Sequence, residues 1–130
     1  MPERVCHILF VEDNADTGQL VAMVLESRGY SVTCVPTKGQ ALELVESSDF
    51  DLYLLDGRLP DGNGVELCRH IRGLHHLTPI LFFSAAAYET DKLRAIEAGA
   101  DGYLTKPTDP NFLVERVDGL LNRSCVSSLN

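Results

Sequence analysis

Five polar residues of this chain follow apolar, strand-like runs, and their types suit phosphate or metal chemistry. Glu12 and Asp13 follow residues 5–11, Asp56 follows 52–55, Ser84 follows 80–83 and Lys106 follows 102–105. The carboxyl ends of parallel strands gather along one edge of a sheet, and ligands bind at that edge. We therefore expect three carboxylates, a hydroxyl and an ammonium in one crevice.

Three carboxylates at one edge would repel one another. Two unit charges 4 Å apart repel by about 4 kcal/mol at an effective dielectric constant of about 20, so the cluster needs raised pKa values, a cation, or both. Mg²⁺ suits such a cluster because it takes one or two carboxylates and accepts phosphate oxygens. Lys106 could pair with Asp56 at rest and with a phosphoryl oxygen later. The alternatives are solvated acids, a surface lysine and a helix N-cap at Ser84.

The elements that must position these residues alternate between strand-like runs and helical patterns. Five strands are expected, near residues 5–11, 32–35, 52–55, 80–83 and 102–105. Apolar stripes predict five helices, marked by Leu20, Val21, Val24 and Leu25; Ala41, Leu42 and Val45; Leu67, Cys68, Ile71 and Leu74; Leu93 and Ile96; and Leu113, Val117, Leu120 and Leu121. Residues 57–64 are dense in turn formers and predict a loop. Strict alternation with right-handed crossovers predicts an α/β fold with a doubly wound parallel sheet.

Composition limits the classes of protein. The chain has 130 residues and a formal charge of −8, which argues against direct nucleic-acid binding by this domain. No apolar run approaches the roughly 20 residues of a membrane span, and no signal peptide is evident, so a cytoplasmic location is expected. The cysteines are expected to be reduced, as is usual in that compartment. We expect one domain over residues 1–123 and a polar tail over 124–130, which holds Cys125.

Several motifs, in order and at this spacing, resemble the receiver domain of two-component response regulators. The resemblance covers residues 5 to 122, and its motifs are residues 11–14 (VEDN), 54–56 (LLD), 59–62 (LPDG), 83–85 (FSA) and 99–107 (GADGYLTKP). It implies a flavodoxin-like sheet of five parallel strands in the order 2-1-3-4-5, with helices on both faces.

The resemblance implies a phosphorylation-dependent signalling switch. Asp56 would accept a phosphoryl group from a sensor histidine kinase or a phosphotransfer domain. Asp13 and Asp56 would ligate Mg²⁺ directly, together with the backbone carbonyl of Arg58, and Glu12 would act through a water.

The resemblance also assigns roles around the phosphoryl group. Ser84 and Lys106 would hold its oxygens, Tyr103 would be the aromatic switch, and the bond before Pro107 would be cis. The signal would change the surface of the fourth helix, fifth strand and fifth helix. That surface would serve an effector domain or partner protein, and a homodimer is a further option.

Other classes of protein fit less well. A phosphatase or phosphomutase using an aspartyl phosphate would usually carry a second acid two residues after the nucleophile, where this chain has Arg58. A degenerate receiver used only for binding would lack site residues, and a flavin-binding protein would have a phosphate loop after the first strand. We therefore expect no turnover enzyme. Because the family usually has another residue at position 58, the Arg58 guanidinium at the site mouth is a candidate for tuning dephosphorylation.

Overall fold

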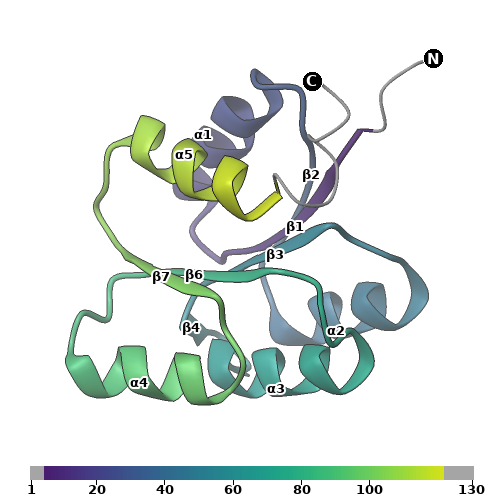
Figure 1. Ribbon diagram of the computed structural model, residues 1–130, viewed down its shortest axis with the longest axis vertical. Helices are drawn as coiled ribbons and strands as arrows, with labels where there is room; N and C mark the ends of the chain where they lie inside the picture. Colours follow the sequence, from purple (N-terminus) through teal and green to yellow (C-terminus); the bar gives the residue numbers. More distant parts are fainter. Residues whose placement is uncertain (1–4, 122–130) are drawn as a thin grey trace.

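The computed structural model describes residues 5–121, which form a five-stranded parallel sheet with helices on both faces (Figure 1). The strands are β1 (His7–Val11), β2 (Ser31–Val35), β3 (Leu52–Leu55), β6 (Ile80–Ser84) and β7 (Gly102–Thr105). Their order across the sheet is β2-β1-β3-β6-β7, and every pair is parallel. This is the predicted order 2-1-3-4-5 for the strands of the main sheet. The predicted tail, residues 124–130, lies outside the described residues.

Five helices connect these strands and cover the two faces of the sheet. Helices α1 (Ala15–Glu26) and α5 (Pro110–Leu121) lie on one face, and α2 (Lys38–Ser47), α3 (Gly64–Leu74) and α4 (Glu89–Glu97) lie on the other (Figure 1). Each face has its own core. Ile8 and Phe10 of β1 pack toward α1 and α5, whereas Leu9 and Val11 pack into the core on the other face. Side chains alternate along a strand, so one strand supplies both cores.

Burial explains which runs become central strands. All residues of β3 and β6 are buried, as expected of strands covered by helices on both faces. The edge strand β2 is only partly covered, and its Cys34 is exposed. Within residues 5–121, no helix is long and apolar enough to cross a membrane.

Three details differ from the sequence-based expectations. Residues within the predicted loop 57–64 form a small antiparallel hairpin, β4 (Arg58–Leu59) and β5 (Gly62–Asn63). Helix α4 is present, but the predicted stripe of Leu93 and Ile96 is exposed, and Ala95 is the buried residue. A small side chain allows the helix to lie close to its neighbours, which the count of large apolar residues did not anticipate. Leu20 of α1 and Leu74 of α3, which were also expected on apolar stripes, are exposed as well.

The third difference concerns the cysteines. The expectation of reduced thiols holds for Cys34 and Cys68, which are free, and is wrong for Cys6, which is disulfide-bonded. Cys125 lies outside the described residues.

The segment from the end of β3 to the start of α3 is tightly constrained. Asn63 caps α3 because its side-chain oxygen accepts the N–H of Glu66 at 2.9 Å. The N–H of Gly64 donates to the carbonyl of Gly57 at 3.0 Å. A Cβ atom on Gly64 would lie 2.3 Å from the backbone oxygen of Asp56, so only glycine fits there without a shift of the backbone.

We expect Gly64→Ala to lower the free energy of unfolding by about 1–3 kcal/mol, the usual cost of overpacking. Urea denaturation measures the loss. Gly73→Ala is the matched control, because Gly73 lies in the same helix and nothing is within 4 Å of the added Cβ. That control should gain about 0.4–1 kcal/mol, since alanine reduces the entropy of the unfolded chain. Equal losses in the two variants would contradict the steric explanation.

Candidate functional site

The structure brings the five polar residues of the strand ends together at the carboxyl edge of the sheet. Glu12 and Asp13 follow β1, Asp56 follows β3, Ser84 ends β6 and Lys106 follows β7. Carboxylate oxygens of Glu12, Asp13 and Asp56 lie within 4.8 Å of one another. Glu12 and Asp56 are buried, whereas Asp13 is exposed. The predicted crevice is therefore present in the fold.

Lys106 is the positive charge of this crevice. Its Nζ donates to Glu12 Oε1 at 2.5 Å and to Asp56 Oδ2 at 3.2 Å, and it lies 5.3 Å from the centre of the Phe83 ring. Burial alone would lower the pKa of Lys106, but the contacts with Glu12 and Asp56 outweigh it and raise the pKa above its ordinary value. The lysine is therefore charged at neutral pH and stands between two carboxylates.

At Glu12, in contrast to Lys106, the effect of burial on the pKa outweighs that of the hydrogen bonds. Burial raises the pKa of its carboxyl, and this effect exceeds the lowering by the hydrogen bonds from Lys106 and from the N–H of Asn14. The nearby charge of Asp56 raises it further. One ammonium therefore does not fully compensate the acids, and a bound cation would lower the pKa of Glu12. Clustered carboxylate oxygens are ligands that Mg²⁺ accepts, so the residues fit this metal.

Ser84 is the hydroxyl of the crevice and is almost fully buried. It is not a helix N-cap, because α4 begins at Glu89 with Tyr88 as its N-cap. Its Oγ accepts the N–H of Ala86 at 3.2 Å. A Cβ on Gly57 would lie 2.9 Å from this Oγ, so the residue after Asp56 must be small for the two strand ends to approach.

A pocket of about 570 Å³ opens between these strand ends and is lined by Asp13, Asp56, Arg58, Ser84 and Lys106, among others. The N–H of Arg58 donates to Asp56 Oδ1 at 3.3 Å, and its side chain is exposed. Within residues 5–121, the guanidinium has no ion-pair partner. The Lys106–Pro107 bond is cis, as predicted.

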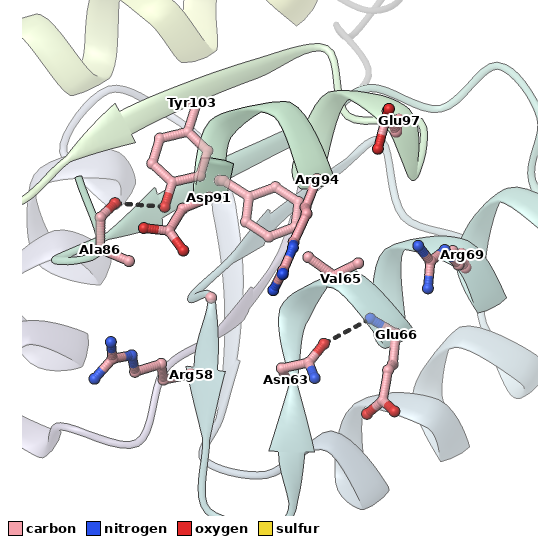
Figure 2. A pocket seen from close by; sticks show the side chains of 12 residues that line it. Arg58, Asn63, Val65, Glu66, Arg69, Ala86, Asp91, Arg94, Glu97 and Tyr103 are labelled. Carbon is pink, nitrogen blue, oxygen red and sulfur yellow. Dashed lines mark hydrogen bonds between the residues drawn. The ribbon is translucent and has the colours of Figure 1, made fainter. Parts of the chain in front are cut away.

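Tyr103 links the site to the α4 side of the molecule. Its ring stacks on Phe82 with 5.7 Å between the centroids and 5° between the planes. Its hydroxyl donates to the carbonyl of Ala86 at 2.6 Å, and the ring borders a second pocket of about 630 Å³ between α3 and α4 (Figure 2). Burial raises the pKa of Tyr103, so its hydroxyl remains a donor at neutral pH. Tyr103 therefore contacts the segment that begins at Ser84.

Sequence reasoning missed two features around the site. Gly57 and Gly64 permit the close contacts of the Asp56 segment, but a glycine in a turn-rich stretch gives no indication of what approaches it. Asp61, at the turn of the hairpin, contacts the start of α2 through hydrogen bonds to Lys38 and Gly39. Its partners are 22 and 23 residues away in the chain, and no local pattern connects them.

Comparison with known proteins agrees with this geometry. A family model described as the response regulator receiver domain matches residues 8–118. The transcriptional regulatory protein CseB of Streptomyces coelicolor is 40% identical over 117 residues, which cover 90% of this chain and 50% of CseB. The regulatory protein VanR of Enterococcus faecium is 37% identical over 89% of this chain and 50% of its own length. The chain thus spans about half the length of these curated relatives.

Solved structures give the same result. A CheY-like response regulator receiver domain protein from Methanospirillum hungatei JF-1 has a TM-score of 0.89 at 30% identity, covering 92% of this chain and 96% of its own. The chemotaxis response regulator CheY4 of Vibrio cholerae has a TM-score of 0.86 at 27% identity, covering 91% of this chain and 100% of its own. The chain therefore belongs to the receiver-domain family of two-component response regulators, the phosphoryl-accepting switches of that signalling system.

Proposed function

We propose that Asp56 is the phosphoacceptor of this switch and that Lys106 and Ser84 hold the phosphoryl oxygens. The observation that carries the proposal is the position of the Lys106 Nζ, 3.2 Å from Asp56 Oδ2, with both residues lining one pocket. An Asp56 oxygen attacks the phosphorus of a phosphohistidine, the P–N bond breaks, and the histidine nitrogen leaves with the electron pair. Lys106 then stabilises charge on the transferred group, and the Ser84 hydroxyl donates to one of its oxygens.

Mg²⁺ is the proposed cofactor. Asp13, Asp56 and the backbone carbonyl of Arg58 would hold it directly, and Glu12 would act through a water. When bound, the ion would neutralise the acids and the oxygens of the incoming phosphoryl group. The cluster of three carboxylates supports this assignment, because it carries more negative charge than Lys106 compensates.

Tyr103 is proposed as the element that passes the signal outward. Its hydroxyl is bonded to Ala86, two residues after Ser84, so a movement of Ser84 toward a phosphoryl oxygen changes the environment of the ring. The surface of α4, β7 and α5 would then read the state of Asp56. Exposed Leu93 and Ile96 on α4 give this surface apolar contacts for a partner.

Receiver domains of response regulators interact with histidine kinases and with effector domains. For this chain we propose a sensor histidine kinase or phosphotransfer domain as the donor. An effector domain, a partner protein or a second copy of the chain would be the target. The formal net charge of −8 argues against direct contact of this domain with nucleic acid. The proposal includes a cytoplasmic location, where phosphohistidine is made from ATP, and no role as a turnover enzyme.

Phosphorylation of Asp56 is tested by intact mass after incubation with acetyl phosphate and Mg²⁺. The parent should gain one phosphoryl group, and Asp56→Asn should gain none, because the amide oxygen is not a competent nucleophile. Asp49→Asn is the control, since Asp49 is an exposed aspartate that precedes β3 instead of following it. Equal labelling of Asp56→Asn and the parent would refute the assignment.

Metal binding is tested by calorimetric titration with Mg²⁺. Asp13→Ala deletes a direct ligand and should weaken binding at least about tenfold, since Mg²⁺ holds few protein ligands. Asp16→Ala is the control, because Asp16 is an exposed acid in the first turn of α1 and lies outside the cluster. Unchanged affinity of Asp13→Ala would place the metal elsewhere.

Arg58 is proposed to lengthen the lifetime of the aspartyl phosphate by shielding the phosphorus from water at the mouth of the pocket. An exposed charged contact contributes only about 0.2–1 kcal/mol, so Arg58→Met should speed dephosphorylation by up to about fivefold. The half-life at fixed Mg²⁺ measures the effect, with Arg69→Met in the neighbouring pocket as control (Figure 2). Slower loss would instead assign Arg58 to stabilising the hydrolytic transition state, and no change would make it a bystander.

A further inference from the structure

The hairpin next to the site is tied to the start of α2 by one side chain. Asp61 lies at the turn between β4 and β5, and its two oxygens accept two backbone N–H groups of the first turn of α2. The Lys38 N–H donates to Oδ1 at 2.7 Å, and the Gly39 N–H donates to Oδ2 at 2.9 Å. These are donors that a helix leaves unsatisfied at its N-terminus, where the helix dipole also favours a negative charge. The two bonds hold the pKa of Asp61 below its usual range, so the group is ionised at neutral pH.

The side chain of Lys38 also contacts the hairpin. Its Nζ donates to Glu66 Oε1 on α3 at 3.3 Å. On the way its side chain crosses Gly62, where a Cβ atom would lie 2.8 Å from Nζ. The first residue of α2 therefore binds the turn through its backbone N–H, and its side chain packs over Gly62.

Only two residue pairs of the hairpin separate the contact between Asp61 and α2 from the site. In the hairpin Leu59 pairs with Gly62, and Arg58 pairs with Asn63. The Arg58 N–H donates to Asp56 Oδ1 at 3.3 Å. The ladder therefore joins the turn to the main chain of position 58, whose carbonyl is a proposed metal ligand.

We propose that Asp61 is a positioning residue for the metal and phosphoryl site: it fixes the hairpin against α2 and so places the main chain of Arg58. This inference rests on the proposed function, because it concerns the same site. The competing explanation is that Asp61 only caps α2 and contributes to stability without affecting the site.

The two explanations differ in a linkage that can be measured. If the hairpin position couples α2 to the site, then Mg²⁺ binding must in turn strengthen the contact between Asp61 and α2, since coupling free energies are reciprocal. The amide protons of Lys38 and Gly39 should then exchange with solvent at least about threefold more slowly when Mg²⁺ saturates the unsubstituted protein. Exchange rates unchanged by Mg²⁺ at both amides would overturn the proposal, and this measurement needs no variant.

The substitution test compares Asp61→Asn with Thr37→Ala. Thr37 is the N-cap of the same helix and accepts the Gln40 N–H at 3.1 Å, but no hydrogen bond joins it to the hairpin among the described residues. Both variants should lower Tm, because each weakens the start of α2. Only Asp61→Asn should weaken Mg²⁺ binding in calorimetry, by about three- to tenfold, which is below the 10–100-fold typical of side chains that orient a metal ligand directly.

Two outcomes of the substitution test would overturn the proposal: Mg²⁺ affinity of Asp61→Asn within twofold of the parent, or equal weakening by Thr37→Ala, which would reduce the effect to helix stability. Failure of the proposed function is a separate result. In that case the unsubstituted protein would show no Mg²⁺ binding, or binding that Asp13→Ala does not weaken. If Mg²⁺ binding that depends on Asp13 is present and Asp61→Asn leaves it unchanged, only the positioning role fails.

Discussion

The compensation of buried negative charge at the carboxyl edge of the sheet is the constraint on which the site depends. Glu12 and Asp56 are removed from water, and one ammonium, that of Lys106, lies between them. The raised pKa of Glu12 shows that this ammonium does not offset the cost of burial. Replacing buried ion pairs with apolar residues is often neutral or stabilising, so stability alone does not explain these acids.

The backbone around Asp56 is shaped by what it must approach. Gly57 lets the Ser84 hydroxyl come near, and Gly64 lets α3 begin against the carbonyl of Asp56. The hairpin between them is closed at its base by Asn63, which caps α3, and at its turn by α2. The acids lie at the ends of the largely buried strands β1 and β3 and the lysine at the end of the partly buried β7, whereas position 58 lies in a short surface hairpin.

Ser84 and Tyr103 lie on neighbouring strands, which brings the crevice close to the α4 side of the molecule. Ser84 ends β6, Tyr103 lies on the adjacent β7, and the carbonyl of Ala86 accepts the Tyr103 hydroxyl. Phe82 of β6 stacks on the same ring, which also packs against the core on the face covered by α2, α3 and α4.

The sequence alone predicted the parallel sheet and the five side chains of the crevice, and the resemblance to receiver domains supplied the strand order. Hydrophobic periodicity, turn residues and the polar residues at strand ends can be recognised locally in the sequence. Right-handed crossovers make the strands parallel, which brings those polar residues to one edge of the sheet. Tertiary structure decided the rest. Ala95 faces the core in place of Leu93 because helix packing rewards close approach, which hydrophobicity does not report. The contact of Asp61 with α2 joins segments more than 20 residues apart. Such a contact depends on how α2 and the hairpin meet in space, so no spacing in the chain encodes it.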